Sequence, residues 1–211
     1  RMIHVLFLDD HELVREGFSR LVDTQEDMQL TASIGSVDKL FMYLREEPVD
    51  VVVLDISLQR RNGIEVLKDI KVQSPTTAVL VLSMHPAEHY ALRALQNGAA
   101  GYITKGSNSS ILFDAIRKVF NGQKYISPQV GELLAQTPGV NGISEPHVLL
   151  SDREFQILCL IGEGKSTSGI ADQLHISENT VRTYRRRILD KMNLQTTADL
   201  IKYTFEHQLL E

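Results

Sequence analysis

Apolar segments of two kinds alternate through the first 125 residues of the chain. Five short apolar runs, several rich in β-branched residues, are typical of buried strands and cover residues 3–8, 28–34, 49–55, 78–82 and 100–104. After each run, apolar residues recur at intervals of three and four, as on one face of a helix. In the first helix the expected buried face consists of Leu13 or Val14, Phe18 and Leu21. The pattern predicts an α/β domain over residues 2–125.

The order of these elements predicts how the strands are connected. Strand–helix units of this length form right-handed crossovers, which gives a doubly wound, five-stranded parallel sheet with helices on both faces. In such a sheet the carboxyl ends of all strands meet at one edge, where ligands bind. The polar residues that close the predicted strands are Asp9, Asp10, Asp55, Ser83 and Lys105. We therefore expect these side chains to converge, although they follow four different strands.

Carboxylates gathered at one edge of a sheet call for a cation. Three carboxylates close together cannot all stay ionised and unpaired away from bulk water. An all-oxygen site with few protein ligands suits Mg²⁺, which keeps several of its waters. With that cation and the Lys105 ammonium neutralising a phosphoryl group, Asp55 can attack its phosphorus while Ser83 donates a hydrogen bond. The candidate reaction is formation of an aspartyl phosphate at Asp55.

The motifs that carry this chemistry resemble those of receiver domains from two-component response regulators. They are Asp9-Asp10, Asp55, Ser83 and the run Gly101-Tyr102-Ile103-Thr104-Lys105. The resemblance implies a flavodoxin-like fold and a histidine kinase that phosphorylates Asp55. It also implies that Asp10, Asp55 and the Ser57 carbonyl coordinate Mg²⁺, with Asp9 acting through a water molecule.

The same resemblance implies a switch and a control of phosphoryl lifetime. Ser83 and Tyr102 would form the switch pair, in which the hydroxyl is drawn to the phosphate and the ring follows it inward. The positions that tune dephosphorylation in this family are occupied by Ser57 and His85. His85 would order or obstruct the attacking water; the alternative is a solvated loop histidine beside Pro86.

The character of the sequence changes after residue 125. Residues 137–146 contain two prolines and two glycines without apolar periodicity, so residues 126–147 are interpreted as a linker. Beyond it, Ser151 with Glu154 is a capping box that starts a helix. Two further helices follow, with the apolar residues Ile170, Ala171, Leu174, Val181, Ile188 and Met192 at helical spacing. This pattern predicts a second, smaller all-α domain over residues 148–211 that contains a helix-turn-helix.

Motifs in this second part resemble the DNA-binding domain of the LuxR type. They are Leu150-Ser151-Asp152-Arg153-Glu154, Ile170-Ala171 to Ile176-Ser177, Thr180-Val181-Arg182 and Ile188-Leu189-Asp190-Lys191-Met192. A receiver joined to such a domain is the arrangement of the NarL/FixJ family of response regulators. One departure from the usual helix-turn-helix pattern is His175, which stands at the turn position where glycine is common, although His tolerates left-handed backbone better than most residues.

The distribution of charge supports a role in DNA binding for the predicted helix within residues 177–191. The whole chain has a formal net charge of −5, yet residues 177–191 hold five basic and two acidic side chains. By the resemblance, Arg182, Thr183 and Arg186 would face the bases of the major groove. The side chains expected to contact the DNA backbone are Thr180, Tyr184, Arg187 and Lys191. The alternative is a merely solvated charged face.

Two apolar features near the end of the chain have structural interpretations. Cys159, the single cysteine, lies in an apolar run and is expected in a core rather than at a metal or disulfide site. The final helix carries a stripe of Leu200, Ile201, Thr204 and Phe205. Part of this stripe is expected in the core, and by the resemblance another part pairs two DNA-binding domains.

Three functions are compatible with these residues. The leading hypothesis is a cytoplasmic, dimeric transcription factor controlled by phosphorylation, which is not an enzyme beyond its own phosphorylation and dephosphorylation at Asp55. This location agrees with the absence of a long apolar run or a signal-peptide pattern. The alternatives are a metal-dependent phosphohydrolase with an aspartyl-phosphate intermediate, and a DNA-binding protein whose receiver is an interaction module that is not phosphorylated. The expected partners of the regulator are DNA, a histidine kinase, a second copy of the chain and RNA polymerase.

Overall fold

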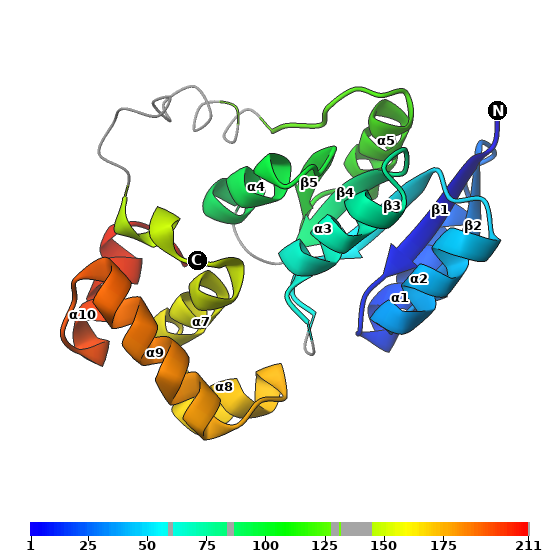
Figure 1. The fold of residues 1–211 in the computed structure, drawn as a ribbon. Coiled ribbons are helices and arrows are strands. Elements are labelled where there is room, and N and C mark those ends of the chain that lie inside the picture. Colours follow the sequence, from blue (N-terminus) through cyan, green and yellow to red (C-terminus); the bar gives the residue numbers. More distant parts are fainter. Residues whose placement is uncertain (59–60, 84–86, 128–130, 132–144, 211) are drawn as a thin grey trace. The chain divides into compact units, whose positions relative to one another are not determined.

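The first part of the chain folds as an alternating α/β unit in the computed structural model, which describes residues 1–58, 61–83, 87–127, 131 and 145–210 (Figure 1). Its elements are β1 (Ile3–Leu8), α1 (Glu12–Val22), β2 (Met28–Ile34), α2 (Val37–Glu46), β3 (Val51–Asp55), α3 (Gly63–Gln73), β4 (Ala78–Ser83), α4 (Ala87–Gln96), β5 (Gly101–Thr104) and α5 (Ser109–Phe120). The five strands form one parallel sheet in the order β2-β1-β3-β4-β5. The predicted doubly wound sheet is therefore confirmed.

The central strand is shorter than the apolar run that predicted it. β3 begins at Val51, two residues after the predicted start at residue 49. Asp50 lies just before the strand, and its carboxylate accepts a hydrogen bond from the His4 backbone N–H at 2.9 Å. All five residues of β3 are buried, because the strand lies between β1 and β4 and helices cover both faces of the sheet.

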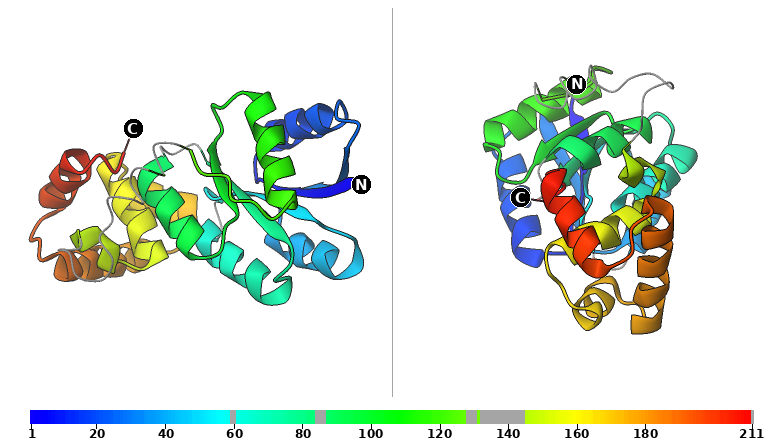
Figure 2. Two further views of the ribbon diagram at one scale, coloured as in Figure 1. Left: turned by 90° about the horizontal axis from the view of Figure 1, so that it is seen from above. Right: turned by 90° about the vertical axis from the view of Figure 1, so that its left-hand side faces the viewer.

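Helices lie on the two faces of the sheet, with α1 and α5 on one and α2, α3 and α4 on the other (Figure 2). Alternate strand residues supply each face. One core, under α1 and α5, joins Val5, Phe7 and Val53 to Phe18 and Ile116. The rings of Phe7 and Phe18 stack with their centroids 4.1 Å apart.

The predicted buried face of α1 was wrong except at Phe18. The helix buries Phe18 and Val22, which are four residues apart and so lie on the same side. Leu13, by contrast, is 83% exposed, and Val14 and Leu21 are also exposed. The stacking of Phe18 on Phe7 sets the rotation of the helix and turns Leu13, Val14 and Leu21 towards solvent.

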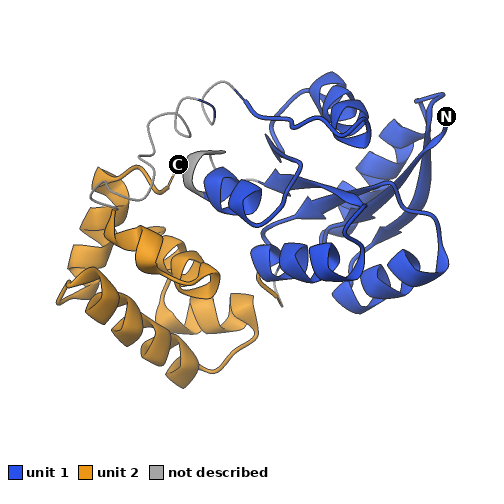
Figure 3. Cartoon of the chain, turned by 45° about the horizontal axis from the view of Figure 1, so that its top comes forward, with its two compact units in different colours: residues 1–58, 63–135 blue, residues 59–62, 136–211 orange. Residues whose placement is uncertain are grey.

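The chain divides into two compact units, residues 1–58 with 63–135, and residues 59–62 with 136–211 (Figure 3). Most of the predicted linker, residues 126–147, lies outside the described residues. In the second unit the elements are η1 (Pro146–Leu149), α7 (Asp152–Gly162), α8 (Thr167–Leu174), α9 (Glu178–Met192) and α10 (Thr197–Glu206). No helix among the described residues has the combined length and apolarity needed to cross a membrane.

Each α-helix of the second unit starts at a hydroxyl-bearing N-cap. The side chains of Ser151, Ser166, Ser177 and Thr196 each accept a hydrogen bond from a backbone N–H of the first turn. The predicted capping box of Ser151 and Glu154 is confirmed. Between α8 and α9, His175 has φ 51° and ψ 45°, so histidine does occupy the left-handed turn position of a helix-turn-helix.

Apolar residues from the four α-helices described in this second unit meet in its core. Cys159 is buried there, as predicted, and so are Val181, Ile188 and Met192 of α9. The apolar stripe of α10 divides into two parts: Leu200 and Thr204 are buried, whereas Ile201 and Phe205 are 40% and 80% exposed. Half of that stripe is therefore core, as expected, and half faces away from it.

Candidate functional site

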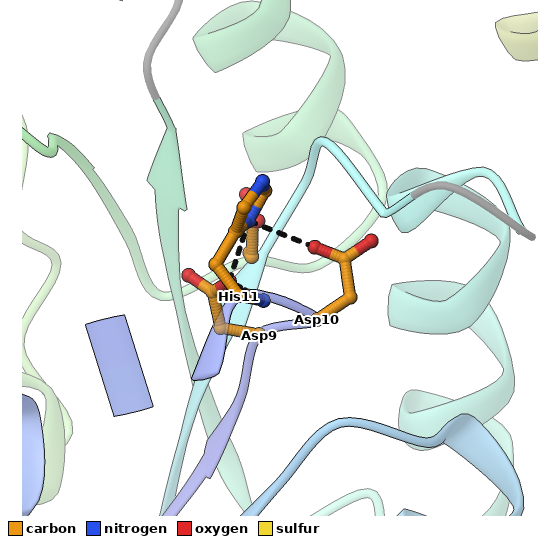
Figure 4. Close-up of side chains that lie close together, drawn as sticks. Asp9, Asp10 and His11 are labelled. Atoms are coloured by element: carbon orange, nitrogen blue, oxygen red, sulfur yellow. Dashed lines mark hydrogen bonds and ion pairs between the residues drawn. The ribbon is translucent and has the colours of Figure 1, made fainter. Parts of the chain in front are cut away.

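Acidic side chains from two neighbouring strands meet at the carboxyl edge of the sheet. Asp9 and Asp10 follow β1, and Asp55 is the last residue of β3. Together with His11 they form a group, here named the acidic cluster, in which each residue has a ligand atom within 4.8 Å of the others (Figure 4). Asp9 and Asp55 are fully buried. The predicted convergence of strand ends is thus observed for these carboxylates.

Lys105 joins the two buried carboxylates. Its Nζ donates to Asp9 Oδ2 at 2.7 Å and to Asp55 Oδ2 at 2.9 Å. The residue is held at the end of β5 because its backbone N–H donates to the Ser83 carbonyl of β4 at 2.7 Å. The ammonium of a residue that follows the edge strand β5 therefore links the ends of β1 and β3.

The electrostatics of the acidic cluster favour a further cation. Burial raises the pKa of Asp55; the Lys105 ammonium opposes this rise and the neighbouring Asp9 adds to it. Burial would lower the pKa of Lys105, but the Asp55 and Asp9 carboxylates outweigh it and raise that pKa. Three carboxylates against one ammonium leave an excess of negative charge and of oxygen donors. This donor set fits a hard divalent ion such as Mg²⁺.

The other residues predicted for this site lie around Asp55. The backbone N–H of Ser57 donates to Asp55 Oδ1 at 2.9 Å, which orients the carboxylate. Ser83 and Tyr102 are buried. Burial raises the pKa of the Tyr102 phenol, and a hydrogen bond with Ser83 opposes that rise. Ser83 and Tyr102 are thus in contact, while His85 lies outside the described residues.

One member of the acidic cluster, His11, was missed in the sequence. Its Nδ1 lies 2.9 Å from Asp10 Oδ1 and 3.0 Å from Asp9 Oδ1. The available signal was its position directly after the Asp9-Asp10 pair at the end of a strand. That position places a side chain near the sheet edge, but spacing alone does not say whether the side chain turns towards the carboxylates.

The second candidate site is the basic surface of α9. All seven residues predicted to contact DNA are exposed or half-buried on this helix. Arg185, which was not among the predicted contacts, is half-buried on the same helix. An open groove of about 730 Å³ is lined by Arg182, Arg185, Arg186, Leu189, Asp190, Asn193, Leu194 and Gln195. The groove combines guanidinium groups with amide side chains, which are groups that bind phosphates and base edges.

Several of the predicted DNA-contacting side chains already have partners within the unit. Arg182 donates to Glu178 at 2.8 Å and to Asn179 at 3.1 Å. The Thr183 hydroxyl donates to the Asn179 carbonyl, and the Thr180 hydroxyl lies 2.8 Å from that of Ser177. The Arg187 guanidinium lies over the ring of Tyr184, 5.9 Å from its centroid.

Lys191 differs from the other predicted contacts because it binds a buried carboxylate. Its Nζ donates to Glu154 Oε2 of α7 at 2.7 Å. The lysine therefore links α9 to α7. Its predicted contact with the DNA backbone stays a prediction, and it would have to be made by a side chain that also holds the two helices together.

Comparison with known proteins identifies the family of each unit. The family model of the response regulator receiver domain matches residues 5–117. The model of bacterial regulatory proteins of the luxR family matches residues 148–204. The two matches fall on the α/β unit and on the helical unit, respectively.

Similar proteins match the chain over nearly its whole length. The chain is 35% identical to the response regulator GacA of Pseudomonas viridiflava over 213 residues, which covers 100% of the chain and 99% of GacA. It is 34% identical to the oxygen regulatory protein NreC of Staphylococcus epidermidis, covering 98% and 99%. RcsB from Salmonella enterica serovar Typhimurium, solved bound to the promoter rprA in the presence of phosphomimetic BeF₃⁻, has the same fold, with a TM-score of 0.66, 22% identity and coverage of 96% and 98%. The chain therefore belongs to the NarL/FixJ family of two-component response regulators, with a receiver domain and a LuxR-type helix-turn-helix domain.

Proposed function

We propose that this protein is a cytoplasmic transcription regulator that is switched by phosphorylation of Asp55 and binds DNA as a dimer. In this proposal residues 2–125 receive the signal, residues 126–147 link the domains and residues 148–211 bind DNA. The observation that carries the proposal is the bridge from Lys105 Nζ to Asp9 and Asp55, 2.7 and 2.9 Å long, beside a cluster with excess negative charge. This arrangement has both a carboxylate nucleophile and the cationic groups that a phosphoryl group needs.

In the proposed reaction an Asp55 oxygen attacks the phosphorus of a phosphohistidine on a kinase. The new O–P bond forms as the P–N bond breaks, and the leaving imidazole takes a proton from solvent. Lys105 already touches Asp55 and neutralises the phosphoryl oxygens. Mg²⁺, held by Asp10, Asp55 and the Ser57 carbonyl with Asp9 acting through water, would supply the remaining positive charge.

The switch is proposed to use the contact between Ser83 and Tyr102. Once Asp55 carries a phosphoryl group, the Ser83 hydroxyl can donate to its oxygens. The Tyr102 phenol then loses the hydrogen bond that it makes with Ser83 in the unphosphorylated protein, and its ring repacks. Ser83 is buried at the end of β4 and Tyr102 is buried within β5, so a small displacement of either must be accommodated by neighbouring side chains.

In the second unit, α9 is proposed to enter the major groove of DNA with the basic surface that carries Arg182 and Arg186. Arg182, Thr183 and Arg186 would read base edges, and the side chains that would hold phosphates are Thr180, Tyr184, Arg187 and Lys191. The exposed Ile201 and Phe205 of α10 would pair two copies of the domain on a two-fold symmetric site. The DNA-bound state of RcsB, which shares the fold, supports this assignment.

Beryllofluoride with Mg²⁺ tests the phosphorylation part of this proposal. It should shift the chain of residues 1–211 from monomer towards dimer in light scattering and strengthen a DNA footprint, because it occupies Asp55 as a phosphoryl group would. Asp55→Asn should show neither the shift towards dimer nor the stronger footprint. If neither beryllofluoride nor acetyl phosphate changes the oligomeric state or the DNA affinity, and Asp55→Asn binds DNA like the parent, the proposal fails.

Replacement of Arg182 tests the proposed base contact. Arg182→Ala should weaken binding to the footprinted site by about 1 to 3 kcal/mol and relax the preference at one base position. Lys202→Ala is the matched control, because Lys202 is an exposed cation on α10 whose Nζ lies 3.6 Å from a Glu206 carboxylate oxygen. Fluorescence anisotropy on the site and on single-base variants measures both. An equal loss on every sequence would reassign Arg182 to a phosphate.

A further inference from the structure

A polar cluster in the second unit ties the chain segment before α7 to the last helix. His147 of η1 is 3% exposed, and its Nδ1 lies 2.9 Å from the Tyr203 hydroxyl of α10. That hydroxyl also donates to Glu145 Oε2 at 3.3 Å. The Nδ1 of His207, which caps the end of α10, lies 3.1 Å from the same oxygen. These four residues are here named the η1–α10 cluster.

The donors and acceptors of this cluster form one directed chain. A phenol has a single proton, and Tyr203 gives it to the Glu145 carboxylate, so the hydroxyl accepts from the Nδ1–H of His147. His207 in turn donates from Nδ1 to the Glu145 carboxylate, which can only accept. Burial and the nearby Glu145 charge raise the pKa of Tyr203 to about 12, which keeps the phenol neutral and its proton in place.

The buried imidazole of His147 has a directional role. An apolar side chain would fill the same space at no cost, whereas a buried polar group costs free energy unless it is hydrogen-bonded. What the imidazole adds is a 2.9 Å hydrogen bond, which fixes position more narrowly than an apolar contact does. Ring contacts act in the same sense: His207 stacks on Tyr203 with centroids 4.0 Å apart, and His147 lies 5.9 Å from Phe155 of α7. The cluster therefore fixes where η1 lies against α10.

The cluster stands between the linker and the residues proposed to pair two domains. It contains the end of the predicted linker, residues 126–147. Tyr203 is two residues from both Ile201 and Phe205, about 200° around the helix, so it points to the opposite side of α10. Exposure agrees, since Tyr203 is buried whereas Ile201 and Phe205 are exposed. One side of α10 thus holds the end of the linker, and the other carries the residues proposed to meet a second copy.

We propose that the η1–α10 cluster positions α10 from the end of the linker, and that through it the state of the receiver alters how two DNA-binding domains pair. A linker end that is displaced on phosphorylation would carry α10 with it, because packed elements shift as bodies rather than deform. His147 and Tyr203 are the positioning residues of this device. The inference rests on the proposed function, since it concerns how phosphorylation of Asp55 reaches α10.

Removal of one hydroxyl tests this coupling. Tyr203→Phe deletes the hydroxyl at the centre of the cluster and keeps the ring that stacks on His207. The matched control is Thr204→Val, which removes a buried hydroxyl from the next residue of the same helix, where it donates to the Ile201 carbonyl at 2.7 Å. The readout is the ratio of DNA affinities with and without beryllofluoride and Mg²⁺. Fluorescence anisotropy on the footprinted site measures it with the chain of residues 1–211.

A second pair of variants acts at the other end of the hydrogen bond. His147→Leu removes the donor, whereas His147→Asn keeps an amide N–H near the place of Nδ1. The affinity ratio should fall about fivefold in Tyr203→Phe and in His147→Leu, the factor equivalent to one buried hydrogen bond. It should keep the parent's value in Thr204→Val and return towards that value in His147→Asn. A merely structural cluster would lower the thermal midpoint of the variants and leave the ratio unchanged.

The inference fails if Tyr203→Phe and His147→Leu keep the parent's ratio, or if Thr204→Val lowers it as much as they do. Far-UV circular dichroism shows whether Tyr203→Phe has lost its helices. If it has, His147→Leu and His147→Asn decide the question, and equal ratios for these two contradict the inference. A parent that does not respond to beryllofluoride contradicts the proposed function. A parent that responds, with an Asp55→Asn that does not and a Tyr203→Phe that responds fully, contradicts the inference alone.

Discussion

Glu154 is a single buried carboxylate on which two helices of the DNA-binding domain depend. Its Oε2 accepts a hydrogen bond from the Ser151 backbone at 2.8 Å at the start of α7, and one from Lys191 Nζ of α9 at 2.7 Å. Burial alone would raise the pKa of Glu154, but the hydrogen bonds from Lys191 and Ser151 outweigh it and lower that pKa. The ionised form is therefore the one that stabilises the domain.

Glu154→Gln should destabilise the DNA-binding domain at neutral pH by about 1 kcal/mol, a value reduced by the partial solvent exposure of Lys191. Because the folded pKa lies below the unfolded one, near 4.5, the stabilisation is complete above that value and is lost as pH falls through the folded pKa. Hydrogen exchange of α7 and α9 amides, compared between variant and parent at each pH, measures this. The difference should shrink at acidic pH.

The control for this prediction is Glu206→Gln, which removes the acidic partner of an exposed pair with Lys202 on α10. It should change exchange protection little at any pH, since exposed pairs contribute weakly. A protection difference for Glu154→Gln that is the same at neutral and acidic pH would contradict the assignment to its charge.

At the scale of single residues, prediction succeeded where local pattern decides the outcome. Cys159 is buried, and His175 adopts the left-handed conformation that its place in the turn requires. Prediction failed for the direction of polar side chains. Neither the turn of His11 towards Asp9 nor the pairing of Lys191 with Glu154, which is 37 positions away, follows from spacing, because both depend on how separate elements pack.

At the scale of elements, α3 starts so close to the segment after Asp55 that only glycine fits. A Cβ on Gly63 would lie 2.5 Å from Ile56 Cα and 2.6 Å from the Ile56 carbonyl oxygen. Both contacts are with backbone, which cannot swing aside as the end of a side chain can. The first residue of α3 thus packs directly against the segment that follows Asp55.

Gly63→Ala should therefore destabilise the receiver by about 1 to 3 kcal/mol, the usual cost of overpacking. Gly17→Ala is the opposite control: Gly17 lies inside α1 with nothing within 4 Å of an added Cβ, so alanine should stabilise by about 0.5 to 1 kcal/mol. Urea titration followed through receiver amide signals in ¹H–¹⁵N spectra compares them. Equal effects of the two substitutions would contradict the close contact.

The existence and order of the elements were predictable, but the rotation of α1 was not. Apolar residues stand at positions 13, 14, 18, 21 and 22, which allows more than one buried face at helical spacing. The face that is buried contains Phe18 and Val22, because Phe7 of β1 offers a ring for stacking at that point. A choice between two nearly equal faces is made by the sheet, and periodicity alone does not record it.

At the scale of the whole molecule, charge is distributed unevenly. The chain has a formal net charge of −5, while α9 carries four arginines and one lysine among its 15 residues. An acidic chain with one basic helix should bind DNA through a few localised phosphate contacts, and its affinity should fall with added salt in proportion to their number.

Arg187→Ala should weaken binding to all DNA sequences alike and reduce the slope of log affinity against log salt by about 1 for each protomer bound. Arg182→Ala, by contrast, should act mainly on the specific site. Anisotropy titrations of the specific and a scrambled duplex between about 50 and 200 mM salt measure both slopes. A loss confined to the specific duplex would mean that Arg187 contacts a base.

The arrangement of the molecule into receiver and helix-turn-helix parts followed from its sequence, as did the convergence of Asp9, Asp10, Asp55 and Lys105. The convergence rests on connectivity, because parallel strands joined by helices must present their carboxyl ends on one side. The sharing of Lys105 between two carboxylates, and the contact of Ser83 with Tyr102, needed coordinates, because a strand end defines a location and not a bonding partner.

The position of Lys105 after the edge strand β5 has a consequence for synthesis of the protein. The ribosome releases Asp9, Asp10 and Asp55 well before Lys105, and β5 is an edge strand of the sheet that lies beside β4. A nascent chain, or one cleaved before residue 101, would contain Asp55 without the ammonium that bridges it to Asp9. If the proposed function holds, a kinase can therefore phosphorylate only a receiver whose sheet has been completed. Unfinished chains would not compete with finished ones for the phosphoryl group.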